Sequence, residues 1–338
     1  MGAEAINPGS GRARLARWEY LALLGILTVG GWLRFSHLDL VEFKGDEAVA
    51  AHLALRFVQG GELPTAGLMS SVGVTNPPLF IYLLIPMFFI TTNVVAVSAM
   101  IAGLGLAAVA ATWWVGRRYY GVWCGLVAAA MFATAPWAVV YSRKIWAQDF
   151  VPVLTTGLCW ALHALVVGRK PRAVFSVVLL PLAVVQVHFS GLALTAMVLV
   201  VLAVLRPKLD WRWAAGGLAV AGVVLVPYLQ MQARTGWRDL AQARAQVGGK
   251  SWEGLPKGMT IQPQSGYPFP RRPSEAWIHG VAMINSGQIE DLIGLDKPAF
   301  AAQSGVVELL QLVQRVLAVG AVVWLGVVIA KEKWAAHR

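Results

Sequence analysis

Apolar runs long enough to cross a lipid bilayer recur along the chain and constrain its fold more than any other feature. A bilayer core about 30 Å thick needs about 20 apolar helical residues for each crossing. Charged residues make up 13% of the 338 residues, against roughly 25% in an average soluble domain. The sequence therefore predicts an all-α polytopic membrane protein. The predicted spans are residues 18–35, 94–116, 120–141, 149–168, 173–188, 190–205, 213–232 and 305–330.

Short clusters of Lys and Arg between these runs predict how the chain is oriented. Cytoplasmic loops of membrane proteins are enriched in Lys and Arg, and such clusters occur at 117–118, 169–172, 206–212 and 331–338. If each cluster is cytoplasmic, both termini lie on the cytoplasmic side of the membrane and the long polar segment 36–76 lies on the outer side. The net charge of +11 does not predict a nucleic-acid partner, because that requires a basic patch on a soluble domain.

Residues 77–90 decide how many spans are expected. This apolar run has 14 residues, and counting it as a full span would place the 117–118 cluster outside. A re-entrant or interfacial helix keeps every basic cluster inside, and protein or a water-filled cavity can surround such a helix. We therefore expect about eight full spans and one partial helix, with nine spans as the alternative.

The same reasoning divides the chain into three parts. A transmembrane module covers residues 1–232, an extracytoplasmic loop covers 233–304, and a final helix with a cytoplasmic tail covers 305–338. The loop carries aromatic residues among prolines and arginines, and we expect it to cover a cavity on the outer face. Aromatic residues of this kind bind sugars but also form interfacial belts.

Acidic residues open a helix in the first outer segment. The sequence Gly45-Asp46-Glu47-Ala48 leads into residues 48–59, whose spacing is compatible with a helix. Asp46 is expected at or near the N-cap, with Glu47 in the first turn. A capped interfacial helix would explain both acids, but ionisable residues in so apolar a chain also mark functional sites.

Basic residues on the predicted outer side need a reason, because they oppose the orientation bias. Arg143 and Lys144 lie in the segment 141–149, which ends at Asp149. A bound anion would explain them. If the chain is helical from Arg143, Asp149 lies close to two turns further on, so the pair can face one cavity. A local pair between Arg143 and a carboxylate is the alternative.

Two further polar residues interrupt apolar surroundings on the same side. Asn76 precedes Pro77 and Pro78, which predict a rigid turn into the short apolar run. His188 breaks an otherwise apolar stretch and would serve either as a hydrogen-bonded packing residue or as a site residue.

Several short motifs, taken in order, resemble a known class of membrane enzymes. The motifs are Arg-Phe at 34–35, Gly-Asp-Glu-Ala at 45–48, Asn-Pro-Pro-Leu at 76–79, Gly-Arg-Arg-Tyr-Tyr-Gly at 116–121 and Tyr-Ser-Arg-x5-Asp at 141–149. Together they resemble the integral-membrane glycosyltransferases of the GT-C class. The nearest types are the protein O-mannosyltransferases and the bacterial enzyme that adds aminoarabinose to lipid A.

The resemblance implies a GT-C-like helical bundle with its active site on the outer face and a polyprenyl-phosphate-linked sugar as the donor. It carries the acids of that class onto Asp46, with Glu47 beside it, and onto Asp149, and its donor-phosphate contact onto Arg143. The candidate substrate-binding residues are Arg143, Lys144, His188, Asn76 and Arg34.

The chemistry of sugar transfer fits these residues independently. Transfer from a lipid phosphate to a hydroxyl needs a carboxylate to accept the hydroxyl proton and cations or a metal to hold the departing phosphate. We expect Asp46 to be the base and Arg143 and Lys144 to hold phosphate. Asp149 would position the acceptor or Arg143, or would bind a divalent ion together with His188.

The sequence thus predicts an inverting glycosyltransferase whose acceptor is a hydroxyl of a protein, a lipid or another glycan. A transporter or lipid flippase is one alternative, because polar groups at the ends of spans also mark substrate paths. However, the charged groups gather at one face, and we detect no internal repeat. A catalytically silent GT-C-like scaffold is the other alternative.

Overall fold

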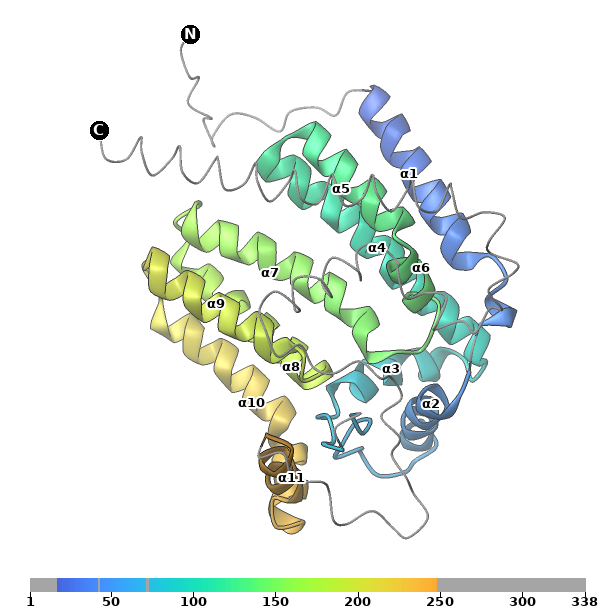
Figure 1. The fold of residues 1–338 in the computed structure, drawn as a ribbon, viewed down its shortest axis with the longest axis vertical. Helices are drawn as coiled ribbons and strands as arrows, with labels where there is room; N and C mark the ends of the chain where they lie inside the picture. Colours follow the sequence, from blue (N-terminus) through green and yellow to red (C-terminus); the bar gives the residue numbers. More distant parts are fainter. Residues whose placement is uncertain (1–16, 42, 71–72, 248–338) are drawn as a thin grey trace. The chain divides into compact units, whose positions relative to one another are not determined.

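The computed structural model describes residues 17–41, 43–70 and 73–247, and this part of the chain is helical (Figure 1). Its one strand-like contact is an isolated antiparallel bridge between Met69 and Thr75. The helices are α1 (Arg17–Phe35), α2 (Gly45–Val58), α3 (Leu79–Ile90), α4 (Val94–Tyr120), α5 (Val122–Thr134), α6 (Pro136–Tyr141), α7 (Val151–Val166), α8 (Val174–Val187), α9 (Gly191–Leu205), α10 (Trp211–Arg234) and α11 (Arg238–Val247), with 3-10 helices η1 (Leu38–Leu40), η2 (Ala147–Phe150) and η3 (Pro171–Ala173).

Three helical segments in the described part are long and apolar enough to cross a membrane. They are Val94–Tyr120, Ala147–Val166 and Trp211–Arg234. Apolar helices of 10–17 residues occupy four other predicted runs, among them Pro171–Val187 and Gly191–Leu205. The predicted all-α, multi-pass membrane character is therefore supported, while the count of eight full spans stays a prediction. The predicted span at 305–330 and most of the 233–304 loop lie outside the described residues.

The predicted single span at 120–141 is wrong, because two helices occupy it. Helix α5 ends at Thr134, and α6 begins at Pro136 and has six residues. Proline has no N–H to donate and disfavours the helical conformation of the residue before it, so the helix breaks at Ala135. Residues 135–140 belong to a second unit of the chain, and the following description concerns the first unit.

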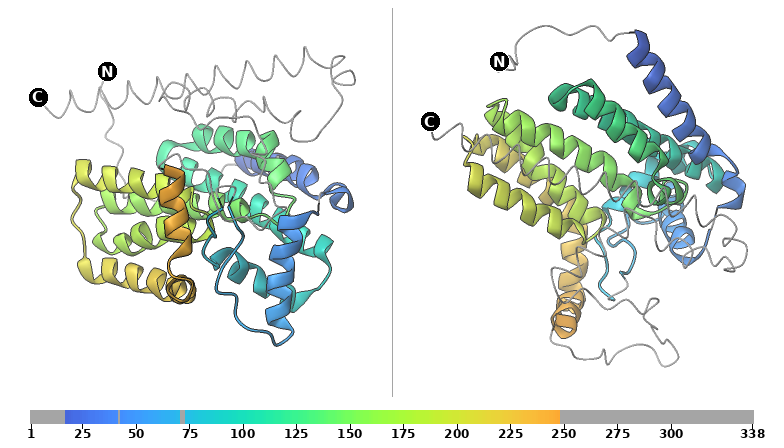
Figure 2. Two further views of the ribbon diagram at one scale, coloured as in Figure 1. Left: turned by 60° about the horizontal axis from the view of Figure 1, so that its bottom comes forward. Right: turned by 45° about the horizontal axis from the view of Figure 1, so that its top comes forward.

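Two sets of packed helices form much of this first unit, which comprises the described residues up to 134 and from 141 onward. Helix α4 packs against α1, α5 and α7, and α8 packs against α7, α9 and α10, as two further views show (Figure 2). Glu19 near the start of α1 forms an ion pair with Arg117 near the end of α4. A Cβ atom on Gly105 of α4 would lie 3.4 Å from Nε of Arg34, near the end of α1. The two helices therefore run antiparallel.

These contacts distinguish two ends, which we call the Arg117 end and the site end. At the Arg117 end, Tyr119 stacks on His163 in the last turn of α7, with ring centroids 3.4 Å apart. At the site end, Arg143 donates a hydrogen bond to the carbonyl oxygen of Ser36, just beyond α1. The segments predicted to lie on the cytoplasmic side and on the outer side thus occupy opposite ends of this unit.

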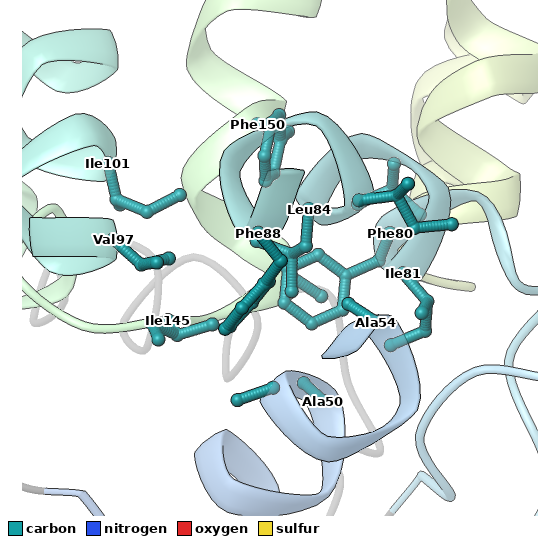
Figure 3. Close-up of a cluster of buried hydrophobic side chains, with 14 residues drawn as sticks. Ala50, Ala54, Phe80, Ile81, Leu84, Phe88, Val97, Ile101, Ile145 and Phe150 are labelled. Atoms are coloured by element: carbon teal, nitrogen blue, oxygen red, sulfur yellow. The ribbon is translucent and has the colours of Figure 1, made fainter. Parts of the chain in front are cut away.

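Helix α3 lies within a buried apolar cluster at the site end (Figure 3). Phe80 near its start and Phe88 near its end both belong to the cluster, together with Ala50 of α2, Val97 of α4 and Phe150 of η2. With 12 residues, α3 is about 18 Å long, less than the bilayer core of about 30 Å. The cluster joins α2, α3, α4 and the start of α7, and so fixes the elements that carry the polar residues described next.

Candidate functional site

The start of α2 separates two neighbouring acids. Glu47 Oε2 accepts a hydrogen bond from the backbone N–H of Lys44, 3.1 Å away. This bond satisfies a free N–H at the helix start. The helix begins at Gly45 with Lys44 as its N-cap, so Asp46 lies near the N-cap and Glu47 in the first turn, as predicted. Glu47 is consequently buried, with 2% exposed, whereas Asp46 is exposed.

Glu47 forms an ion pair with the predicted outer cation Lys144. The Lys144 Nζ lies 2.8 Å from Glu47 Oε1, and 11% of the lysine side chain is exposed. The same Nζ lies 4.9 Å from the ring centroid of Trp146. This pair joins α2 to the segment between α6 and α7, and sequence analysis did not anticipate it.

Asp149 is buried beside this pair. It is 6% exposed, and its Oδ2 accepts a hydrogen bond from the Trp146 backbone N–H at 3.0 Å, at the start of η2. The charges of Lys144 and Glu47 both act on its carboxylate. The structure therefore brings Asp46, Glu47, Lys144 and Asp149 together, and we call these four residues the charge cluster.

The surroundings of Asp46 change its acidity. Partial desolvation raises the pKa of its carboxyl group above the ordinary aspartate value, the negative charge of Glu47 raises it further, and the positive charge of Lys144 opposes them. Asp46 is therefore a stronger base than an ordinary aspartate, and it is the acid of the cluster that solvent reaches.

Arg143 is oriented differently from the prediction. Residues 142–146 form a turn and an extended stretch instead of a helix, so Arg143 and Asp149 are not successive positions of one helix. The Arg143 Nη2 donates to the carbonyl oxygens of Ser36 and His37, at 3.0 Å for His37. Its Nε is buried and has no hydrogen-bond partner in the described part of the chain. Among the described residues, the cation of this segment that pairs with a carboxylate is Lys144, with Glu47 as its partner, rather than Arg143.

Both polar atoms of the Asn76 side-chain amide form hydrogen bonds with backbone groups of the protein. Its Nδ2 donates to the Leu68 carbonyl oxygen at 2.9 Å, and its Oδ1 accepts from the Phe189 backbone N–H at 3.2 Å. The predicted turn at Pro77 and Pro78 leads into α3 as expected. Asn76 therefore ties the segment before α3 to the turn between α8 and α9.

His188 lies at the C-cap of α8, in that same turn. Its Nδ1 accepts a hydrogen bond from the Ser190 backbone N–H at 3.2 Å and lies 2.9 Å from the Ser190 hydroxyl oxygen. Because Nδ1 accepts the Ser190 N–H, the neutral imidazole carries its proton on Nε2.

Arg34 is fully buried and serves helix packing. Its guanidinium donates to the carbonyl oxygens of Gly30 at 3.1 Å, Ala133 at 2.7 Å and Phe132 at 3.1 Å. Ala133 and Phe132 are in the last turn of α5, where carbonyl groups lack partners within the helix. Arg34 therefore caps α5, and the structure does not bring it into the charge cluster.

The described residues contain no group of three or more His, Cys, Asp or Glu side chains placed to hold a metal ion. The predicted pairing of Asp149 with His188 at a divalent ion thus has no third His, Cys, Asp or Glu ligand in this part of the chain.

A second polar group at the site end was missed by sequence analysis. Asp239 of α11 accepts hydrogen bonds from Gln232 Nε2 and from the Tyr228 hydroxyl, the latter at 3.3 Å. The same hydroxyl lies 2.9 Å from the Thr75 carbonyl oxygen. Tyr228 and Gln232 lie four residues apart in an apolar run, so they share one face of α10. That spacing was the available signal, whereas α11 lies where a loop was predicted.

Comparison with protein-family models, with curated proteins and with solved structures finds no match to this chain. The resemblance to the GT-C class therefore stays a prediction that depends on the short motifs alone.

Proposed function

We propose that this chain is a membrane glycosyltransferase that transfers a sugar from a polyprenyl-phosphate carrier to a hydroxyl acceptor. The charge cluster is the observation that carries the proposal: the open Asp46 carboxylate lies beside the buried pair of Glu47 and Lys144. Sugar transfer removes a proton from the acceptor hydroxyl and develops negative charge on the carrier phosphate. A carboxylate with raised proton affinity suits the first of these changes, and a fixed cation beside it suits the second.

Asp46 acts as the general base in a single displacement. The acceptor oxygen attacks C1 of the sugar while the bond from C1 to the carrier phosphate oxygen breaks, and the bonding electrons leave with that oxygen. The proton of the acceptor hydroxyl moves to the Asp46 carboxylate. The products are the glycoside, inverted at C1, and the free polyprenyl phosphate.

Cations at the site end stabilise the departing phosphate. Lys144 supplies a positive charge that Glu47 holds in place, so Glu47 acts as a positioning residue. Arg143 is anchored through Nη2 on two carbonyl oxygens, which holds its positive charge at this end. Donors fixed in advance near developing negative charge need no reorganisation during the reaction.

The proposed topology keeps this site on the extracytoplasmic side of the cell membrane. It has about eight full spans, the partial helix α3, and both termini in the cytoplasm. The short α3 and the opposite positions of Arg117 and Arg143 in the first unit support it. The proposed mechanism assigns no step to Arg34, Asn76 and His188, whose hydrogen bonds described above are to other residues of the protein.

A transfer assay with the full chain in nanodiscs tests the proposal. A panel of radiolabelled polyprenyl-phosphate sugars serves as donors and a membrane extract as acceptor. Asp46→Asn should lower the rate by at least about 100-fold, because it removes the general base, while donor binding persists. Asp149→Asn should also lower the rate, because it changes the buried carboxyl group that adjoins Lys144 and Glu47.

The matched control is Asp39→Asn, which removes an exposed acid of η1, the 3-10 helix that follows α1. It should keep the wild-type rate. A folded wild type that transfers no sugar from any donor contradicts the proposal. Movement of the labelled donor across the membrane would then favour a transporter or lipid flippase, and donor binding alone would favour a silent scaffold.

A further inference from the structure

Exposed cations gather at the Arg117 end, where α8 and α10 begin. We call Lys170, Arg172, Lys208 and Arg212 the basic patch. All four are exposed. The Arg172 Cζ lies 6.0 Å from the ring centroid of Trp213, and η3 contacts α10. The fold thus brings together two basic segments that α8, α9 and their connections separate in the chain.

No carboxylate of the described residues forms an ion pair with a member of the basic patch. The two ion pairs at the ends of the unit involve Arg117 and Lys144 instead. The acid adjacent in sequence, Asp210, is already used, because its Oδ1 accepts a hydrogen bond from the Arg212 backbone N–H at 3.2 Å and caps α10. No carboxylate of the described residues therefore neutralises the positive charge of the patch.

The helices that follow these cations do not explain them. Lys170 and Arg172 precede α8, and Arg212 lies in the first turn of α10, where the helix dipole disfavours positive charge. Arg206 provides the contrast: it follows α9, and its Nε donates to the Ala203 carbonyl oxygen at 3.3 Å. A role in capping accounts for Arg206 and not for the patch.

An aromatic residue joins the patch to an apolar surface. Trp213 is 43% exposed and packs edge-on against Phe175, with ring centroids 6.1 Å apart. Tryptophan is enriched where membrane helices meet water. A partner at this place has to carry negative charge beside an apolar portion.

We propose that the basic patch binds the phosphate headgroup of an anionic phospholipid in the membrane leaflet at the Arg117 end. The planar guanidinium groups of Arg172 and Arg212 bind phosphate oxygens, and the two lysines add point charges. Trp213 lies at the level where the headgroup meets the acyl chains. The proposal is independent of sugar transfer.

Native mass spectrometry of the full chain in detergent tests this site. The protein is mixed with phosphatidylglycerol, which is anionic, or with phosphatidylcholine, which is zwitterionic. Wild type should retain phosphatidylglycerol preferentially. The double substitution Arg172→Gln/Arg212→Gln should weaken this retention about 25-fold, because each cation near an anionic lipid contributes about fivefold.

The matched control removes two other exposed cations of the same end, Arg17 of α1 and Arg118 of α4, as Arg17→Gln/Arg118→Gln. It should retain the lipid as wild type does. An equal loss in both double variants would show diffuse attraction and overturn the site. So would a wild type without preference for the anionic lipid, or lipid that excess inorganic phosphate displaces completely.

Discussion

Each end of the first unit buries a glutamate against a cation, but the two ion pairs differ in what surrounds them. Glu19 and Glu47 are both 2% exposed. At the Arg117 end, the Arg117 guanidinium faces both Glu19 oxygens through Nε and Nη2 and lies 5.9 Å from the Trp113 ring centroid. A planar fork of this kind satisfies the carboxylate by itself.

At the site end, three carboxyl groups lie close enough to the ammonium group of Lys144 to be affected by its charge. Glu47 pairs with it directly, and its charge also acts on Asp46 and Asp149. The negative charge of Glu47 raises the pKa of Asp46 and so favours proton uptake there. The comparison teaches that burial of a charged pair does not by itself identify a site. The pair of Glu19 and Arg117 is self-contained, whereas the charges of Glu47 and Lys144 also act on the exposed carboxyl group of Asp46.

The largest effect should come from breaking the pair at the Arg117 end. Glu19→Ala leaves the Arg117 guanidinium without its carboxylate, and 21% of that side chain is exposed. We expect a loss of about 3–5 kcal/mol in the free energy of unfolding, as for other broken buried pairs. Equilibrium unfolding in detergent measures it, with Asp39→Ala as the exposed-acid control. Selective loss of sugar transfer per folded molecule would show that this pair is not purely structural.

The next effect concerns the pair at the site end. Lys144→Met should lower the transfer rate by about 100-fold, because a fixed charge near the departing phosphate is lost. It should also lower stability, because Glu47 stays buried without its cation.

The double variant Glu47→Gln/Lys144→Met sharpens this test. It removes both charges, so stability in the same unfolding experiment should recover while the transfer rate stays low. Recovery of both quantities would make the site-end pair equivalent to that of Glu19 and Arg117, and the comparison between the two ends would fail.

Much of the fold was predictable because apolar length determines where membrane helices form. The predicted runs 94–116 and 213–232 correspond to α4 and α10 within a few residues. The break at Ala135 was missed because Pro136 lies in an unbroken apolar run, where hydropathy gives no sign of a helix end. Helix α11 was missed because its sequence is polar and tertiary contacts of Asp239 hold it.

The candidate site was predictable as a set of residues but not as a set of contacts. Asp46, Glu47, Lys144 and Asp149 were all candidates, and the structure brings them together. Which of two adjacent acids is buried depends on where α2 begins, and the hydrogen bond from Lys44 to Glu47 decides that. The partner of Lys144 lies far away in the chain, so no local pattern could identify it.

A smaller effect is expected at the second polar group of the site end. Asp239→Ala removes the acceptor for Gln232 and Tyr228, which hold α11 to α10. Backbone amides of α11 should exchange with solvent about 10-fold faster, because hydrogen bonds to charged groups each contribute about 1.5–3 kcal/mol and part of this is recovered by water. Hydrogen exchange with mass spectrometry measures this, and Arg244→Gln on the exposed side of α11 is the control. Unchanged exchange would mean that other contacts hold α11.

The smallest expected effect is a shift in pH dependence, and its sign separates the two neighbouring acids. A general base must be deprotonated, so kcat/KM should fall as pH decreases through the pKa of Asp46, which lies above its ordinary value. Glu47→Gln removes a negative charge that raises this pKa and leaves the Lys144 charge, which lowers it, unneutralised. Both changes have the same sign, so the acid limb of the pH profile should move to lower pH. If the rate falls while the limb stays in place or moves to higher pH, the titrating base is not Asp46.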